Sequence, residues 1–261
     1  MRVTRAFCDR IEAAEVDGLR RCIDNVQARF PELHAECASI GDGIAAFAGP
    51  EMPFSEAMGI GLTGPAAQDE ARAVDRFYRE RGCEPRVRVT PYTHTAFVRA
   101  LAALDYVPLD VETAFACDLR ALGARRDDRF ELMRDAEEWS RATGSAYVDG
   151  PCTKRDRDIG FSICTSPEVT ALEARVDGVI VASGCMDVQG EIAGFFGAAT
   201  APAHRGRGWQ SALIADRAAR GVERGARFGR ATTRLGTVSE QNFRRAGFVV
   251  LYTRTTWGTT T

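Results

Sequence analysis

The second half of the chain alternates between apolar stretches and amphipathic stretches, a pattern typical of strands and helices in turn. Residues 191–200 form a glycine-rich apolar run, which favours a buried strand. The stretch from about residue 209 to 223 places Leu213 and Ile214 among its apolar positions and arginines among its polar ones, which indicates a helix. Three more elements are expected: a strand over 226–233, a helix over 239–246 and a strand over 249–257.

The first half repeats this order of elements. Its pattern predicts a strand over 56–63, a helix over 66–81, a strand over 85–90, a helix over 93–104 and a strand over 106–115. Thr93 and Ser239 are expected to cap the second helix of each half. Strands that alternate with helices favour an α/β domain in each half. We therefore expect two domains, residues 1–122 and 128–261, with a charged linker at 121–128.

The turn after the strand at 191–200 has the composition of an anion-binding loop. It reads Ala-Pro-Ala-His-Arg-Gly-Arg-Gly-Trp-Gln over residues 201–210. A glycine-rich turn that opens a helix leaves backbone N–H groups unpaired at the positive end of the helix dipole, where phosphate binds. The loop is not a Walker loop, since no Gly-Lys-Ser/Thr follows, and it lacks the third glycine of a G-x-G-x-x-G turn. The alternative is an exposed turn that carries these residues by chance.

The pattern Pro202-x-x-Arg205-Gly206-x-Gly208 after an apolar strand resembles the acyl-coenzyme A loop of the GNAT superfamily of N-acetyltransferases. The pattern of that family is Arg/Gln-x-x-Gly-x-Gly/Ala, and Gln210 replaces its last small residue. The Gly-Phe corner at residues 247–248 is a second match. The resemblance covers about residues 128–257.

The resemblance implies a fold, a co-substrate and a binding site. Each half would be an α/β, GNAT-like domain with a mixed, mostly antiparallel sheet flanked by helices. The second would use acetyl-CoA as co-substrate, without a metal. The strand before the loop would splay open to pair with the pantetheine arm, and one of its N–H groups would serve the oxyanion. The coenzyme-binding residues implied are Ala198, Ala199, Thr200, Arg205, Gly206, Arg207, Gly208, Trp209, Gln210 and Asn242.

The two halves differ at this loop. The stretch between Glu56 and Gly82 is shorter than its counterpart between Glu191 and Gly225. Residues 63–68, which stand at the position of the loop, hold no arginine and a single glycine. We therefore interpret the first half as a degenerate copy that has lost coenzyme binding.

Acetyl transfer to an amine needs a group that takes a proton, because a free amine is mostly ammonium at pH 7. A carboxylate can do this directly or through water. Glu191, at the start of the strand, is the first candidate for this base, and Asp187 and Glu173 are alternatives. Each of the three is otherwise explained as an exposed carboxylate at a strand end.

Many members of the family carry a tyrosine four residues before the Gly-Phe corner, which protonates the leaving thiolate. Phe243 occupies that position here, and Tyr252 on the last strand is the acid that we expect instead. Loss of a general acid lowers a rate by about 10²–10⁴-fold and does not abolish it. The expected function is therefore an N-acetyltransferase. A non-catalytic acyl-CoA sensor is the first alternative, and a module that uses the loop for no ligand is the second.

Composition and charge argue against two other classes of protein, nucleic-acid binders and membrane proteins. A formal net charge of -2 argues against a general nucleic-acid binder, so we expect Arg217, Arg220, Arg224 and Arg227 to form a solvated helix face. No apolar run reaches transmembrane length, and no signal-peptide core follows the first residues, which favours a cytoplasmic protein away from membranes. The expected partner is an amine acceptor, either a small molecule or a protein. The sequence leaves open the identity of the acceptor and the oligomeric state.

The cysteines and histidines are not arranged as a metal site. The chain has 8 cysteines and 3 histidines, and no Cys-x-x-Cys pair occurs. Zinc sites need close ligand pairs, so we expect no structural metal and free, mostly buried thiols.

Overall fold

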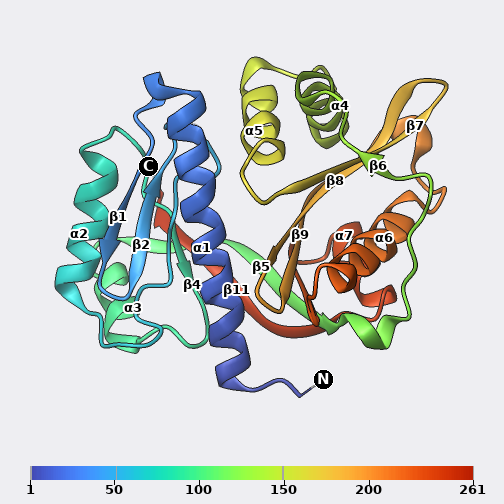
Figure 1. The fold of residues 1–261 in the computed structure, drawn as a ribbon. Coiled ribbons are helices and arrows are strands. Elements are labelled where there is room, and N and C mark those ends of the chain that lie inside the picture. The colour runs from blue at the N-terminus through green and yellow to red at the C-terminus, as the bar shows by residue number, and fades with distance from the viewer. Residues whose placement is uncertain (1, 51, 149, 261) are drawn as a thin grey trace. The chain divides into compact units, whose positions relative to one another are not determined.

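The computed structural model describes residues 2–50, 52–148 and 150–260. These residues divide into two compact units (Figure 1). The first unit consists of residues 2–114 together with 251–260, and the second consists of residues 115–250. The chain therefore passes from one unit to the other after residue 114 and again after residue 250, and not at the expected linker of residues 121–128.

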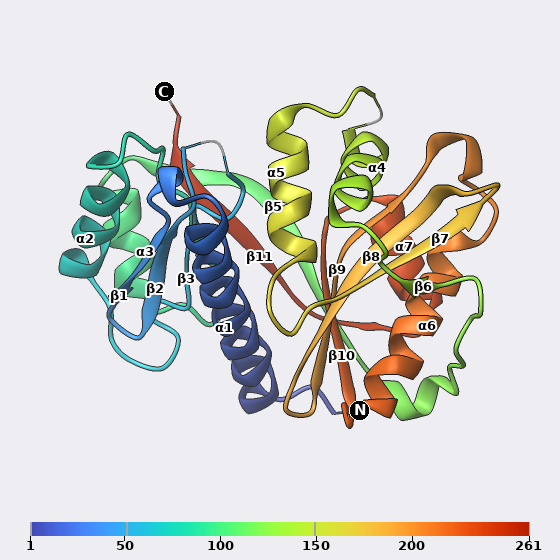
Figure 2. The same cartoon turned by 45° about the horizontal axis from the view of Figure 1, so that its top comes forward.

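The first unit is an α/β unit with helices on both faces of its strands (Figures 1 and 2). Its strands follow the order β1-β2-β3-β4-β11. Helix α1 packs on β1 and β2, whereas the core formed by α2, α3 and the strands includes Val74, Phe77, Phe97 and Leu101. The elements are α1 (Arg5–Arg29), η1 (Pro31–Leu33), β1 (Glu36–Ile40), β2 (Gly43–Phe47), β3 (Ala57–Met58), α2 (Gln68–Arg79), β4 (Val87–Val89), α3 (Thr95–Ala102) and the start of β5 (Tyr106–Asp118).

The second unit is built around the order β10-β9-β8-β7-β6. Helices α6 and α7 cover one face of this sheet and α4 and α5 cover the other (Figures 1 and 2). The elements after β5 are η2 (Leu119–Leu122), β6 (Glu131–Leu132), α4 (Ala136–Val148), α5 (Lys154–Cys164), β7 (Thr170–Val176), β8 (Val179–Gln189), β9 (Ile192–Thr200), η3 (Pro202–His204), α6 (Trp209–Glu223), β10 (Phe228–Arg234), α7 (Val238–Arg245) and the start of β11 (Val249–Thr259).

The fold class expected from the sequence is confirmed. Most strand pairs are antiparallel, including β7 with β8 and β8 with β9, while β9 with β10 and β3 with β4 are parallel. Helices flank the sheet of each unit. The alternation of strands and helices therefore predicted an α/β protein, and the resemblance predicted its mostly antiparallel sheet.

Two strands belong partly to each unit. Strand β5 begins in the first unit and ends in the second, and β11 does the reverse. Within the first unit β11 pairs antiparallel with β4, with Thr255 opposite Val89. Residues 251–260 therefore pack with the N-terminal half of the chain, in contrast to the expected domain of residues 128–261.

The segment expected as a linker packs into the second unit. Leu122 and Ala124 pack against the core of that unit. Asp216 of α6 accepts hydrogen bonds from Arg126 Nε (3.1 Å) and from the backbone N–H of Asp127 (3.0 Å). A charged, loop-like composition therefore did not mark a domain boundary, because the segment packs on the core and a buried carboxylate binds Arg126.

Three local predictions are wrong. The strand expected over 56–63 shortens to β3, since turns occupy residues 59–64. Helix α3 begins after His94, and Thr93 instead accepts the backbone N–H of Thr90 (3.0 Å). Helix α7 is capped by Thr237, whose hydroxyl accepts the N–H of Glu240 (3.3 Å), rather than by Ser239.

Candidate functional site

Strand β9 carries a bulge near its C-terminal end. Cys185 of β8 pairs with Phe196, but Ser183 pairs with Ala199, so two residues of β9 lie opposite Gly184. One of the two is Gly197, whose φ of 58° lies in the left-handed region that favours glycine. A bulge breaks the hydrogen-bond ladder and redirects the backbone groups that follow it.

Beyond the same point, β9 also separates from its parallel neighbour β10. In the described part of the chain, the pairing of these strands runs from Ile192 opposite Phe228 to Phe195 opposite Ala231 and stops there. On the side of β10, the backbone N–H and C=O groups of the last residues of β9 are therefore not paired with that strand. A strand edge of this kind can pair with an extended ligand in the manner of an added strand.

The loop after β9 leads into an uncapped helix N-terminus. Gly206 and Gly208 have φ values of 74° and 80°, which only glycine adopts without strain. Gly208 is the N-cap of α6, and no side chain caps the helix there. The first helical bond runs from the N–H of Ala212 to the carbonyl of Gly208, so the N–H groups before it have no partner within the helix. Donors of this kind, together with the helix dipole, favour an anion.

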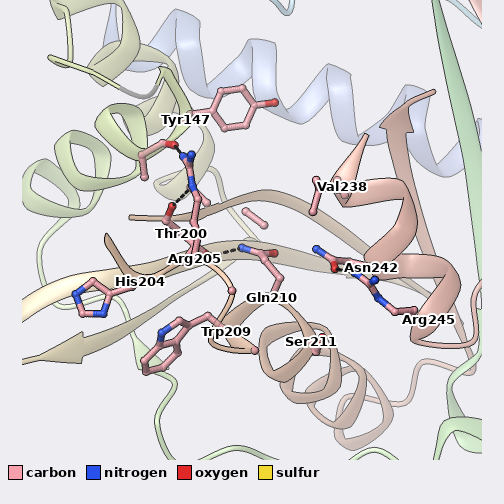
Figure 3. A pocket seen from close by; sticks show the side chains of 16 residues that line it. Tyr147, Thr200, His204, Arg205, Trp209, Gln210, Ser211, Val238, Asn242 and Arg245 are labelled. Carbon is pink, nitrogen blue, oxygen red and sulfur yellow. Dashed lines mark hydrogen bonds between the residues drawn. The ribbon is translucent and has the colours of Figure 1, made fainter. Parts of the chain in front are cut away.

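A cavity of about 600 Å³ joins these two features. It is lined by the end of β9, the loop, the start of α6, the start of α7 and the end of α4 (Figure 3). The residues expected from the sequence that line it are Ala198, Ala199, Thr200, Arg205, Gly206, Gly208, Trp209, Gln210 and Asn242. Arg207 is the one expected residue that does not line it, and its side chain is exposed.

Arg205 and Gln210 fix the loop. The guanidinium of Arg205 donates to the carbonyls of Thr200 (3.2 Å) and Ala146 (2.8 Å), and it thereby ties the loop to β9 and α4 (Figure 3). The amide of Gln210 donates to the hydroxyl of Thr200 (2.9 Å). Arg205 therefore has a structural role in addition to the charge that it brings to the cavity.

Sequence reasoning missed Tyr147 of α4 and Arg245 of α7. Tyr147 at the end of α4 lines the cavity with 76% of its surface exposed. Arg245 of α7 also lines it and donates to the side-chain oxygen of Asn242 (2.7 Å; Figure 3). The separation of three residues between Asn242 and Arg245, which places both on one helix face, was the signal that could have found Arg245.

The structure does not bring Glu191 to the cavity. Glu191 is exposed at the turn before β9, and its carbonyl accepts the N–H groups of Arg227 and Phe228 (both 2.9 Å). The cavity adjoins the opposite end of this strand. At about 3.3 Å per residue the two ends of β9 lie roughly 25–30 Å apart.

The alternative carboxylates are engaged in the sheet. Asp187 is buried, accepts the N–H of Gly194 (3.1 Å) and lies 3.7 Å from Arg230. Glu173 is buried and pairs with Arg175 (2.8 Å). Neither lines the cavity.

Neither Phe243, which stands at the tyrosine position of the family, nor Tyr252, the expected acid, lines the cavity. Phe243 is in the core of the second unit, where its ring packs against those of Phe115 and Phe248 at 6.2 and 5.0 Å. Tyr252 belongs to the first unit, and its buried hydroxyl donates to the carboxylate of Glu12. Burial, and then the charge of Glu12, raise the pKa of Tyr252 well above its ordinary value, so it holds its proton.

The expected solvated arginine face of α6 is only half correct. Arg224 and Arg227 are exposed, but Arg217 and Arg220 retain 1% and 8% of their accessible surface. Arg220 pairs with Asp216 at 2.5 Å. A helical period alone could not separate these buried arginines from exposed ones, because the carbonyls of Cys185, Phe196 and Phe130 that accept from them come from other elements.

In the first unit, a side chain of the protein itself binds the backbone N–H groups of the loop after β3. The carboxylate of Asp42 accepts the backbone N–H groups of Gly61 (2.5 Å), Thr63 (2.6 Å) and Gly64 (3.0 Å). Burial alone would raise the pKa of Asp42, but these bonds hold it below its ordinary value. A carboxylate of the protein therefore takes the donors that an anionic ligand would need.

The described residues include no group of three or more metal-ligating side chains that could hold an ion. The eight cysteines are free thiols. None of the described helices combines the length and apolar character that crossing a membrane requires.

Solved structures with the same fold are GNAT N-acetyltransferases. A GCN5-related N-acetyltransferase from Kribbella flavida has a TM-score of 0.69 and 15% identity, over 97% of this chain and 95% of that one. A GNAT-family putative acetyltransferase from Novosphingobium aromaticivorans has a TM-score of 0.58 and 16% identity, over 93% and 99%. A tandem GNAT protein from the clavulanic acid biosynthesis pathway has a TM-score of 0.56 and 15% identity, over 84% and 78%.

At these identities the likeness shows the fold, which is that of GNAT N-acetyltransferases. No family model matches the sequence. No curated protein matches it either.

Proposed function

We propose that this protein is an acetyl-CoA-dependent N-acetyltransferase with one coenzyme site per chain, in the second unit. The acceptor is an amine of a small molecule or of a protein. The observation that carries the proposal is the continuity of the cavity: the diverging end of β9 and the uncapped N-terminus of α6 line the same space. An acyl-CoA needs both features, because it combines an extended amide-containing arm with a pyrophosphate.

The pyrophosphate would lie at the start of α6. The backbone donors around Gly206, Gly208 and Trp209 favour an anion there, and the helix dipole adds to this preference. The pantetheine arm would run along Ala198 and Ala199 at the end of β9. The thioester would then lie near the bulge, where a backbone N–H is available to its oxygen.

The proton of the amine would leave through water. The described lining of the cavity contains no carboxylate. Its titratable side chains include Tyr147 and His204. Water is therefore the direct acceptor of the proton in this proposal.

The first unit would bind no coenzyme. Asp42 occupies the backbone donors of its loop, which supports the interpretation of the first half as a degenerate copy.

A non-catalytic acyl-CoA-binding protein is the second candidate. It is favoured by the burial of Phe243 in the core and by the lack of a carboxylate among the described lining residues. Such a protein would bind acyl-CoA without transferring its acyl group.

Two measurements test the proposal. Titration calorimetry with coenzyme A should give one site per chain. Release of free thiol from acetyl-CoA, measured against a panel of primary amines, should exceed the rate without amine. Loss of this release in Gly208→Val would show that the activity belongs to this site. Binding without release under every amine supports the second candidate, and no binding at all rejects both.

A further inference from the structure

Helix α6 contains a buried cation that the proposed function leaves unexplained. Arg217 retains 1% of its accessible surface, and in the described chain no carboxylate lies within ion-pair distance of it. Its neighbour Asp216 is bound instead to Arg220 (2.5 Å) and Arg126 (3.1 Å). Burial lowers the pKa of Arg217 to about 10, so it stays charged at neutral pH. Burying a guanidinium without a counter-ion is costly, which points to a specific role.

The hydrogen-bond partners of Arg217 are backbone carbonyls. Its Nε donates to the carbonyl of Leu213 on the same helix (3.4 Å), and the other two carbonyls lie at the bulge between β8 and β9. Its Nη1 donates to the carbonyls of Cys185 (3.0 Å) and Phe196 (3.3 Å), the residue pair at which the regular ladder ends. The guanidinium also lies 4.9 Å from the centre of the Phe195 ring. Its Nη2 is buried and has no hydrogen-bond partner among the described residues. The charged guanidinium of Arg217 is therefore in direct contact with the irregular part of β9.

The carbonyl of Phe196 and the N–H of Gly197 belong to one peptide group. A hydrogen bond from a cation to that carbonyl polarises the whole peptide and strengthens its N–H as a donor. The bulge at Gly197 leads into Ala198 and Ala199, which line the cavity. Arg217 thus holds the geometry of the bulge and places a positive charge one peptide away from the cavity.

We propose that Arg217 is a positioning residue that stabilises the anionic intermediate of acetyl transfer through the β9 bulge, an inference that rests on the proposed function. In this step the amine nitrogen forms a bond to the thioester carbon, and the C=O π pair moves to the oxygen. The carbonyl then re-forms, the C–S bond breaks, and its electron pair leaves with sulfur as the thiolate of coenzyme A. The nitrogen loses its proton to water. The oxygen carries a full negative charge only between the two steps, so a nearby fixed cation favours the intermediate over the thioester.

The test compares variants that separate charge from size. Arg217→Lys keeps the charge, whereas Arg217→Met has a similar length without it. Arg220→Met is the matched control, because it also removes a buried guanidinium from α6 but one that is paired with Asp216. Calorimetry with coenzyme A, which lacks the acetyl carbonyl, measures coenzyme binding separately from the reaction.

In Arg217→Met we expect kcat to fall about 10- to 100-fold, while the Kd for coenzyme A changes less than about threefold. Arg217→Lys should recover most of the lost kcat, and Arg220→Met should keep the kcat of the wild type. Equal losses in the Lys and Met variants would overturn the role of the charge. A loss in Arg220→Met as large as in Arg217→Met would also overturn the proposal, since it would reflect general destabilisation.

A spectroscopic readout separates this inference from the proposed function. Infrared difference spectra of bound [1-¹³C]acetyl-CoA report the polarisation of its carbonyl without any turnover. The stretching frequency should be lower when bound to the wild type or Arg217→Lys than to Arg217→Met. If the wild type is active and its bound acetyl-CoA has the same carbonyl stretching frequency as in Arg217→Met, the role of Arg217 is rejected and the proposed function is not. A wild type that binds no coenzyme would reject both. Should Arg217→Met not fold, Arg217→Gln, which is neutral and can donate, replaces it in each comparison.

Discussion

Replacing Gly208 by valine should separate coenzyme binding from folding. Gly208 caps α6 with a φ of 80°, and a Cβ placed there would meet no atom within 4 Å. Gly225, with a φ of 89° and equally open surroundings, ends the same helix away from the cavity. A side chain in the left-handed region costs about 1–2 kcal/mol, so Gly208→Val and Gly225→Val should lose similar stability.

Only Gly208→Val should also lose affinity for the coenzyme. The start of α6 offers charge-assisted hydrogen bonds to a pyrophosphate, each worth about 1.5–3 kcal/mol. Loss of one or two of them raises the Kd roughly 100-fold. At a coenzyme concentration of 100 times the wild-type Kd, the coenzyme stabilises the wild type by about 2.7 kcal/mol. The same concentration would stabilise Gly208→Val by about 0.4 kcal/mol.

The assay is urea unfolding of the three proteins with and without coenzyme A. The coenzyme-dependent gain in unfolding free energy should be alike in the wild type and Gly225→Val and nearly absent in Gly208→Val. An equal gain in both variants would refute the assignment of the anion site to the start of α6. No gain in the wild type would refute the coenzyme site itself.

Three other outcomes are expected. The low pKa of Asp42 means that its carboxylate stabilises the fold above the pKa of the unfolded state, about 3.9, and that this stability is lost as the pH falls through the lower folded pKa. The difference in unfolding free energy between the wild type and Asp42→Asn, measured from pH 7 to 3, should therefore become smaller at the acid end. A difference that stays constant with pH would contradict this reasoning. Phe243→Tyr places a hydroxyl in the core, so it should lower stability by about 1–3 kcal/mol without raising the acetyl-transfer rate, and a faster variant would show that the ring reaches the thiolate. Tyr252→Phe deprives the buried Glu12 carboxylate of a donor, so chemical unfolding should report a loss of about 1–3 kcal/mol while the coenzyme Kd stays unchanged. A weaker Kd would instead connect Tyr252 to the coenzyme.

The geometry of the loop at residues 201–210 could be predicted from the sequence because all its determinants are local. A strand, two glycines at left-handed positions and a helix start follow one another within residues 191–210, so chain order alone brings them together. The elements around the loop were placed closely for the same reason: α6 occupies the expected residues, and β9 begins one residue later than expected. The α/β class followed from the alternation of strands and helices, and the mostly antiparallel sheet followed from the resemblance.

The catalytic assignments failed where they depended on position along a strand or in the fold. Glu191 shares β9 with the cavity but stands at its far end, a separation that the length of the strand alone already implied. Tyr252, the expected acid, lies in the first unit, where its hydroxyl donates to Glu12, and the pattern of its strand does not show which unit the strand end joins.

The sequence by itself thus determined the alternation of strands and helices, the order of the elements over residues 56–115 and 191–257, and the local geometry of the loop at 201–210, because each depends on neighbours in the chain. The tertiary structure decided the rest. It brought Tyr147 and Arg245 to the cavity from α4 and α7, and it assigned residues 251–260 to the N-terminal half, because their strand pairs with β4. It also buried Arg217, whose Nη1 donates to backbone carbonyls of β8 and β9. Every residue has a backbone carbonyl, so the pattern of side chains does not show which carbonyls will accept such a bond.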